Sequence, residues 1–353
     1  MDISQIDKNF KIETKIKKNN IKFYDVKKPP FELFGVFYKD GMFRRMSEIV
    51  AKDTNAGVAT LHTNTAGGRV RFKTTSPYVA INTKISGLGK MSHFSFSGSI
   101  GFDLYIKLNE NEVFNGTFIP PLNVLEQYEG IIDFGSNDEK EITINMPLYS
   151  NVEELYIGLE DDALLKEPEP YKISKPIVYY GSSITQGGCA SRPGMSYEAI
   201  ISRELNCDYI NLGFSGNAKG EDVIAEYIAD IDMSMFVYDY DHNAPSLEHL
   251  ENTHKRMFDI IRKKNPNLPM IILPRPKFVL TPEEQKRFDI VKNTYDTAIS
   301  NGDKNVYLIN GKELMSKAKM DGTVDNCHPT DFGFASMASA IIPVMKDILQ
   351  KGE

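Results

Sequence analysis

Residues that could carry out acyl transfer occur at four separate places in the second half of the chain. Ser183, in a glycine-flanked turn, offers a hydroxyl nucleophile, and Asp325 and His328, three residues apart, offer a carboxylate and a base. Gly216 offers a backbone N–H with no side chain in the way, and Asn243 offers an amide donor. Acyl transfer needs this set, because a base must activate the nucleophile and donors must meet the oxyanion.

The elements around these residues alternate between strand and helix. Apolar strands are predicted at 177–180, 208–212, 235–238, 270–273 and 306–309, and helices at 196–205, 221–229, 247–264, 282–300 and 331–349. Five strands that alternate with helices predict a three-layer α/β/α domain, over residues 174–353, whose parallel sheet is covered on both faces. Ligands of such sheets bind beyond the carboxyl ends of the strands, where the candidate residues stand.

The first part of the chain, residues 1–165, has a different pattern. Short runs with a period of two, separated by turn residues, predict strands at 69–73, 78–85, 101–107, 141–144 and 154–157. Many strands without intervening helices favour a β-sandwich, with one short helix expected at 44–52. The segment 161–176 contains three prolines and is interpreted as the linker.

Length and composition limit the classes of protein. A chain of 353 residues has room for about two domains. The net charge of −7, from 41 Lys and Arg against 48 Asp and Glu, argues against a nucleic-acid partner. Three cysteines favour a reducing compartment, and the N-terminal segment has no leader-like apolar stretch. We therefore expect a cytoplasmic protein with no membrane partner.

The four chemical blocks resemble the SGNH or GDSL-type esterases and acylhydrolases. The resemblance extends over residues 174–350 and implies a flavodoxin-like fold and an enzyme without a cofactor. It implies Ser183 as the nucleophile, Asp325 and His328 as its partners, and the N–H groups of Gly216 and Ser183 with the amide of Asn243 as oxyanion donors. The blocks are Gly181-Ser182-Ser183-Ile184-Thr185, Ser215-Gly216-Asn217, His242-Asn243-Ala244-Pro245 and the Asp-x-x-His of Asp325 and His328.

A second resemblance lies in the first domain. The string Gly101-Phe102-Asp103-Leu104-Tyr105 is similar to the Gly-x-Asp-Leu-Tyr signature of a jelly-roll-like β-sandwich that precedes certain SGNH esterases. Two departures from the family pattern, Ser182 in place of an aspartate and Asn243 outside a Gly-x-Asn-Asp setting, fit that subgroup. The resemblance therefore covers nearly the whole chain.

Other interpretations of the same residues stay open. His242, with neighbouring aspartates and His328, could suggest a metal site, but no known ligand spacing supports one, and we expect no metal. Cys327 is expected to be an inert thiol, and His93, like three other histidines, has no companion in sequence. Arg192, in the loop after the nucleophile, is a candidate for substrate binding, as is His242, although a solvent-exposed arginine is an equal alternative.

The sequence thus predicts a metal-independent serine esterase. Its substrate would be a small-molecule or oligosaccharide ester, from which it removes a small acyl group such as acetyl. The sandwich would cover and narrow one side of the active-site mouth. Two alternatives are a non-catalytic glycan-binding protein with a degenerate esterase fold, and a lipase or thioesterase that takes longer acyl chains.

Overall fold

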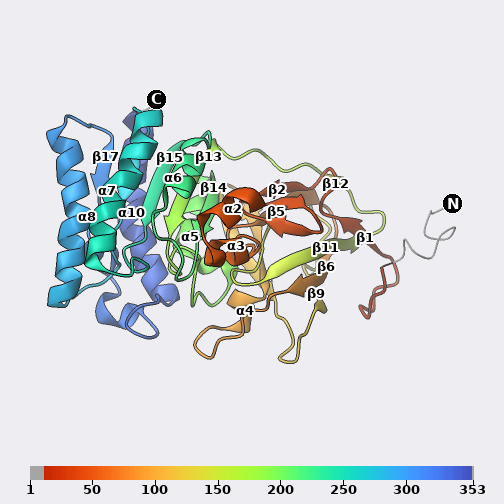
Figure 1. Cartoon of the computed structure of the whole chain (residues 1–353). Helices are drawn as coiled ribbons and strands as arrows, with labels where there is room; N and C mark the ends of the chain where they lie inside the picture. The colour runs from red at the N-terminus through yellow and green to blue at the C-terminus, as the bar shows by residue number, and fades with distance from the viewer. Residues whose placement is uncertain (1–11, 352–353) are drawn as a thin grey trace.

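The computed structural model describes residues 12–351, and the second half of this range is built on a five-stranded parallel sheet (Figure 1). The strands lie in the spatial order β14-β13-β15-β16-β17. This order, 2-1-3-4-5 along the chain, is the flavodoxin-like one. Their bounds are β13 Ile173–Gly181, β14 Cys207–Gly213, β15 Met235–Asp239, β16 Met270–Ile272 and β17 Val306–Leu308. The predicted three-layer domain is confirmed.

Helices cover both faces of this sheet because side chains alternate across it. Tyr179 of β13 packs in the cluster with α5, α9 and α10, whereas its neighbour Tyr180 packs with α6, α7 and α8. All six helices are placed as predicted except α9, which the sequence pattern did not indicate. Their bounds are α5 Tyr197–Leu205, α6 Asp222–Ala229, α7 Leu247–Lys264, α8 Pro282–Ser300, α9 Gly311–Leu314 and α10 Asp331–Lys351.

The last helix, α10, is long and apolar enough to cross a membrane by length and composition alone. In this structure Phe334, Met337, Ile341 and Met345 are fully buried against the sheet domain. These spacings of three and four residues place them on one face of the helix. The apolar composition of α10 is therefore explained by its position in the core.

The first half of the described range forms a sandwich of two antiparallel sheets, as predicted. One sheet has the order β1-β11-β6-β9 and the other β12-β5-β10-β7-β8, with β2 beside β5 and a separate hairpin of β3 and β4. The strands are β1 Ile21–Asp25, β2 Glu32–Phe34, β3 Phe37–Lys39, β4 Met42–Arg44, β5 Arg69–Thr74, β6 Tyr78–Ser86, β7 Phe102–Leu108, β8 Asn111–Phe118, β9 Gln127–Asp133, β10 Lys140–Asn145, β11 Asn151–Glu160 and β12 Leu165–Lys166.

Short helical elements connect these strands and the loops. The sequence predicted these elements less well than the strands. The helix expected at 44–52 is wrong at its start, because Arg44 ends β4 and pairs there with Phe37. The helix α2 begins only at Glu48, and α3 was not predicted. The short helical elements are α2 Glu48–Thr54, α3 Ala56–Leu61, α4 Phe96–Ser99 and the 3₁₀ turns η2 Pro193–Met195 and η3 Lys319–Gly322.

Two buried arginines of the sandwich fasten it to β14, the edge strand of the parallel sheet. Arg45 donates to the carbonyl oxygens of Asn211 at 3.0 Å and Gly213 at 2.7 Å. Arg69 forms an ion pair of 2.5 Å with Asp208, and its guanidinium lies 3.9 Å from the ring centroid of Tyr209. Buried carbonyls need such donors, because an unpaired one costs free energy.

We expect Arg45→Met to lower the free energy of unfolding by about 2 kcal/mol or more, because it leaves buried carbonyl oxygens without a donor. The matched control is Arg256→Met, which removes a 63% exposed side chain from a surface ion pair and should cost less than about 1 kcal/mol. Urea unfolding measures both variants. Equal losses would show that Arg45 does not fasten the two domains.

Candidate active site

The structure brings the predicted nucleophile, base and carboxylate into one hydrogen-bonded chain. Ser183 Oγ lies 2.9 Å from His328 Nε2, and His328 Nδ1 lies 2.7 Å from Asp325 Oδ2. The other oxygen, Asp325 Oδ1, accepts the backbone N–H groups of Cys327 at 3.0 Å and His328 at 2.7 Å. The spacing of three residues thus lets the carboxylate orient both the ring and the turn that carries it.

The ionised form of Asp325 is favoured in this turn. Partial burial acts to raise the pKa of Asp325, but the hydrogen bonds from the His328 ring and from two backbone N–H groups outweigh it, and the pKa lies below its usual value. An ionised carboxylate accepts a hydrogen bond from the Nδ1–H of His328, so the lone pair of the ring is on Nε2 and faces Ser183. This is the arrangement a general base requires.

The turn that presents Ser183 follows β13 directly. A Cβ at Gly181 would lie 2.3 Å from the Asp239 carbonyl oxygen, so only glycine fits there. Ser182 is fully buried and its Oγ accepts the Ile184 N–H at 3.2 Å, so this side chain shapes the turn. From the sandwich, Tyr149 donates its hydroxyl to the Ser183 carbonyl oxygen at 3.0 Å. The nucleophile is therefore held from both domains.

The backbone N–H groups of Ser183 and Gly216 have no hydrogen-bond acceptor among the described residues. Gly216 adopts φ +69°, and a Cβ there would meet nothing within 4 Å. Its neighbours are engaged, since Ser215 N–H donates to Gln186 Oε1 and Asn217 N–H to the Phe214 carbonyl. Among the hydrogen bonds found over residues 12–351, neither the Gly216 nor the Ser183 N–H has an acceptor. Both were predicted as oxyanion donors.

The third predicted donor, Asn243, lies in the loop after β15. Its Nδ2 donates to the Phe214 carbonyl oxygen at 2.9 Å, which uses one of the two amide hydrogens and links this loop to the one that carries Gly216. Arg287 fixes the loop by donating to the carbonyl oxygens of Asp241 at 2.8 Å and Ala244 at 3.1 Å. The second amide hydrogen of Asn243 stays available for an oxyanion.

The sequence suggested His242 and its neighbouring aspartates for a metal site and Cys327 for a thiol nucleophile, and the structure shows different contacts for these side chains. Burial lowers the pKa of His242 to about 4, and its Nδ1 lies 3.7 Å from Cys327 Sγ. Asp241 is paired with Arg275 at 2.9 Å and not with His242. Burial, with a contribution from Asp325, raises the pKa of Cys327 to about 11. A thiol with that pKa is protonated near neutral pH and is a poor nucleophile.

Arg192 ties the loop after the nucleophile to the sandwich. Its guanidinium donates to Asp103 Oδ2 at 2.9 Å and to the Tyr105 hydroxyl. The same Asp103 oxygen accepts the Gly194 N–H at 2.8 Å, and Oδ1 accepts Asn145 Nδ2 at 2.8 Å. Asp103 and Tyr105 belong to the Gly-x-Asp-Leu-Tyr string, so this signature holds a loop of the neighbouring domain. A substrate contact by Arg192 stays a prediction.

Ser191, in the same loop, connects the sandwich to the turn of the base. Its carbonyl oxygen accepts the hydroxyls of Ser95 at 2.8 Å and Ser97 at 2.6 Å. Its own N–H and hydroxyl donate to Asp331, which begins α10 three residues after His328. The sequence predicts residues 186–195 as an irregular loop that lines the site, but no spacing rule connects Ser191 with Ser95, Ser97 or Asp331, and the contact of Tyr149 was also missed.

His93 is a further site residue that the sequence did not reveal. It stands in the sandwich, and its ring centroid lies 5.8 Å from that of His328. The two residues are far apart in the chain, and the segment before α4 carries no motif. The sandwich therefore contributes an imidazole beside the base.

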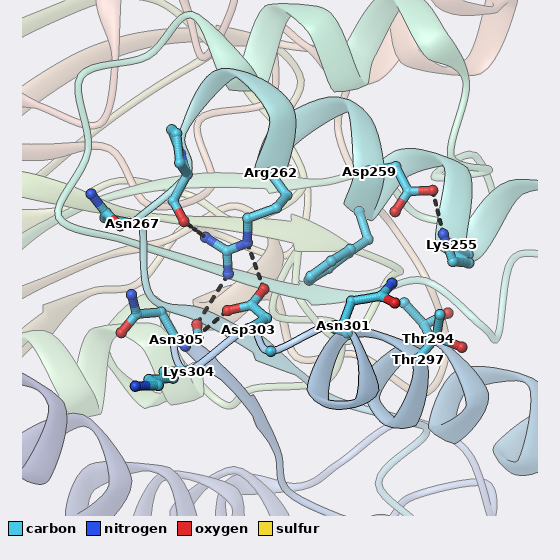
Figure 2. A pocket seen from close by; sticks show the side chains of 14 residues that line it. Lys255, Asp259, Arg262, Asn267, Thr294, Thr297, Asn301, Asp303, Lys304 and Asn305 are labelled. Atoms are coloured by element: carbon cyan, nitrogen blue, oxygen red, sulfur yellow. Dashed lines mark hydrogen bonds and ion pairs between the residues drawn. The ribbon is translucent and has the colours of Figure 1, made fainter.

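A cavity of about 440 Å³ lies elsewhere, between the carboxyl ends of α7 and α8 and the loop before β17 (Figure 2). There Arg262 pairs with Asp303 at 2.7 Å and donates to the Leu268 carbonyl oxygen at 2.6 Å. This cavity is at the amino end of β17, whereas the hydrogen-bonded residues Ser183, His328 and Asp325 lie at the carboxyl end of β13. Its arginine is already engaged by the protein, in the ion pair with Asp303 and in hydrogen bonds to backbone carbonyl oxygens, so we assign no chemistry to the cavity.

Comparisons with known proteins assign the family of this chain. Residues 174–346 match the GDSL-like lipase/acylhydrolase family, and residues 21–165 match the GxDLY domain, the N-terminus of SGNH-hydrolase-type esterases. A crystal structure described as a GDSL-like lipase from Bacteroides ovatus is 30% identical, with a TM-score of 0.84 over 94% of this chain and 98% of the other. The chain belongs to the GDSL-like lipase/acylhydrolase family, and it is a carboxylic ester hydrolase.

Two more distant structures share the fold. A salicylyl-acyltransferase from a tetracycline biosynthetic pathway is 18% identical, with a TM-score of 0.76 over 94% of this chain and 98% of that one. A family two carbohydrate esterase from Clostridium thermocellum, solved with cellohexaose, is 14% identical, with a TM-score of 0.61 over 91% and 99%. Among curated proteins, none matches significantly.

The Asp103→Asn variant tests the contact between the Gly-x-Asp-Leu-Tyr string and the loop that carries Arg192 and Gly194. Asp103 is 0% exposed and Arg192 18% exposed at their side chains, so removing the negative charge should cost about 3 kcal/mol of unfolding free energy. The control is Asp133→Asn, which breaks an exposed pair with Lys18 in the same domain and should cost less than about 1 kcal/mol. If urea unfolding gave the two variants the same stability, the contact would contribute nothing.

Proposed function

We propose that this protein is a metal-independent serine esterase that removes a small acyl group, such as acetyl, from a hydroxyl of a carbohydrate or related molecule. The observation that carries the proposal is the chain from Ser183 Oγ through His328 to Asp325, with two N–H groups beside it that have no acceptor within the described residues. A nucleophile, an oriented base and preorganised donors together define acyl-enzyme chemistry.

In the proposed reaction Ser183 Oγ attacks the acyl carbonyl carbon and His328 Nε2 takes the hydroxyl proton. The N–H groups of Ser183 and Gly216 and the amide of Asn243 donate to the oxyanion. As the acyl–oxygen bond breaks, His328 returns its proton to the departing sugar hydroxyl. Water then attacks the acyl-enzyme with His328 again as the base, which releases the carboxylic acid and restores Ser183.

The proposal of a small acyl group and a polar acceptor rests on what the sandwich contributes to the site. Tyr149 donates to the Ser183 carbonyl oxygen and His93 lies beside the ring of His328, and both side chains are polar. The carbohydrate esterase bound to cellohexaose supports a sugar acceptor at the level of the fold. The alternative of a glycan-binding protein is disfavoured, because a binding module does not need an oriented base beside a serine.

Substitution of the proposed catalytic residues tests the mechanism. We expect Ser183→Ala and His328→Ala to abolish turnover of p-nitrophenyl acetate, and Asn243→Ala to lower kcat by about 10²–10³, the usual loss for one oxyanion donor. Cys327→Ser should stay active, because the Cys327 thiol of the unaltered protein is protonated near neutral pH and is a poor nucleophile. An inactive Cys327→Ser beside an active Ser183→Ala would assign the nucleophile to the thiol.

Acyl length tests the specificity. Rates of p-nitrophenyl acetate, butyrate and octanoate hydrolysis should show kcat/KM falling steeply with chain length, because the sandwich side chains found beside the nucleophile and the base, Tyr149 and His93, are polar and offer a long alkyl chain little apolar area. Acetylated sugars should be better substrates than simple alkyl acetates. Equal or faster turnover of the octanoyl ester would favour the lipase alternative instead.

A further inference from the structure

We propose that His93, Cys189 and His328 form a zinc-binding site, and that a zinc ion bound there stops catalysis by occupying the base. The binding part of this inference is independent of the proposed function, whereas the inhibition rests on it. The metal in this proposal is an inhibitor and supplies nothing to the reaction.

The three side chains already lie close enough to share one ion. One ligand atom from each, two imidazole nitrogens and a sulfur, lies within 4.8 Å of the other two. Around a tetrahedral zinc, with bonds of about 2.0 Å to nitrogen and 2.3 Å to sulfur, neighbouring ligand atoms are about 3.5 Å apart. The cluster therefore needs shifts of about one ångström, within the range of side-chain rotation.

The chemistry of the ligands also suits zinc. Imidazole and thiolate are the ligands that this borderline ion prefers, and a set of three leaves its fourth position for water. Burial raises the pKa of the Cys189 thiol to about 12, so zinc must displace the thiol proton when it binds. Zinc-binding histidines usually donate their second ring N–H to a carboxylate. His328 already does so through Nδ1 to Asp325 at 2.7 Å. The contact with Asp325 thus orients the Nε2 lone pair of His328 for a metal as well as for the hydroxyl proton of Ser183.

Cys189 and His93 belong to two separate segments that both lie next to His328. Cys189 has φ +75°, a conformation fixed by the turn in which Gly188 N–H donates to the Ser183 carbonyl at 2.8 Å. A Cβ built on Gly188 would lie 3.4 Å from His328 Cδ2, the ring carbon bonded to Nε2. The turn therefore faces the nitrogen that is free to bind, and His93 completes the group from the sandwich.

His328 cannot bind the zinc ion and activate Ser183 at the same time. His328 Nε2 has one lone pair, which either accepts the hydroxyl proton from Ser183 or binds the metal. An ion held by all three side chains would therefore block the first step of acyl transfer. The inhibition should depend on His93 and Cys189, residues with no part in that step.

The experiment measures zinc inhibition and cobalt binding separately. We expect zinc to inhibit p-nitrophenyl acetate hydrolysis by the whole chain, and His93→Ala and Cys189→Ser each to raise the half-inhibiting concentration at least about tenfold, since even outer partners of a metal site contribute that much. Each variant is compared with its own metal-free rate. Cys327→Ser, the matched thiol control, should keep the sensitivity of the unaltered protein.

Cobalt(II) supplies the readout that does not depend on activity. A thiolate-to-cobalt absorption band in the near ultraviolet should appear in the unaltered protein and in Cys327→Ser, and should be absent in Cys189→Ser. Zinc sensitivity that is the same in all variants, or no cobalt band in the unaltered protein, would overturn the inference. A cobalt band in a protein without esterase activity would support the metal site and refute the proposed function.

Discussion

The hydrogen bond between Ser183 Oγ and His328 Nε2 joins two turns that are 145 residues apart, and the rest of the site depends on keeping that distance at 2.9 Å. The parallel sheet places both turns at the same edge, because the carboxyl ends of its strands meet there. The sandwich then fixes each turn separately. Tyr149 holds the Ser183 carbonyl, and Ser191, itself held by the sandwich, holds Asp331 at the start of the helix that follows His328. The catalytic geometry is therefore a property of both domains.

Apolar side chains such as Met46, Phe94 and Leu148 of the first domain pack in the clusters of the parallel-sheet domain, and buried polar contacts between the domains add orientation to this packing. Removing charges from water is costly, and a buried ion pair recovers that cost only when its remaining hydrogen-bonding groups are satisfied. Asp103 meets this condition, because its two oxygens accept from Asn145, Arg192 and the Gly194 N–H. An apolar contact could slide, whereas these directed bonds allow one arrangement of the loop. The Gly-x-Asp-Leu-Tyr string thus acts on the catalytic domain through its carboxylate.

The sequence predicted the parts of this protein that follow from local periodicity and missed those that depend on distant contacts. Strands buried on both faces, such as 235–238, are apolar runs between amphipathic helices, and each candidate catalytic residue stands beside one end of such an element. Edge strands such as β8 and the helices α2 and α3 have weaker patterns, and Arg44 belongs to a hairpin instead of a helix. The neighbours His93 and Tyr149 were not predictable, because a single sequence carries no information about which loops of one domain reach the other.

The two departures from the family pattern leave the site intact, and the structure explains how. An aspartate before the nucleophile could accept a backbone N–H in its turn; Ser182 does this with its hydroxyl, which accepts from Ile184, and its buried position would make a charge costly. Asn243 lacks the usual neighbours, but Arg287 fixes its loop through two carbonyl oxygens, and its amide still lies against the loop of Gly216. A chain that had lost catalysis would not need to hold these donors, so the altered blocks are consistent with the proposed site, built in a different way.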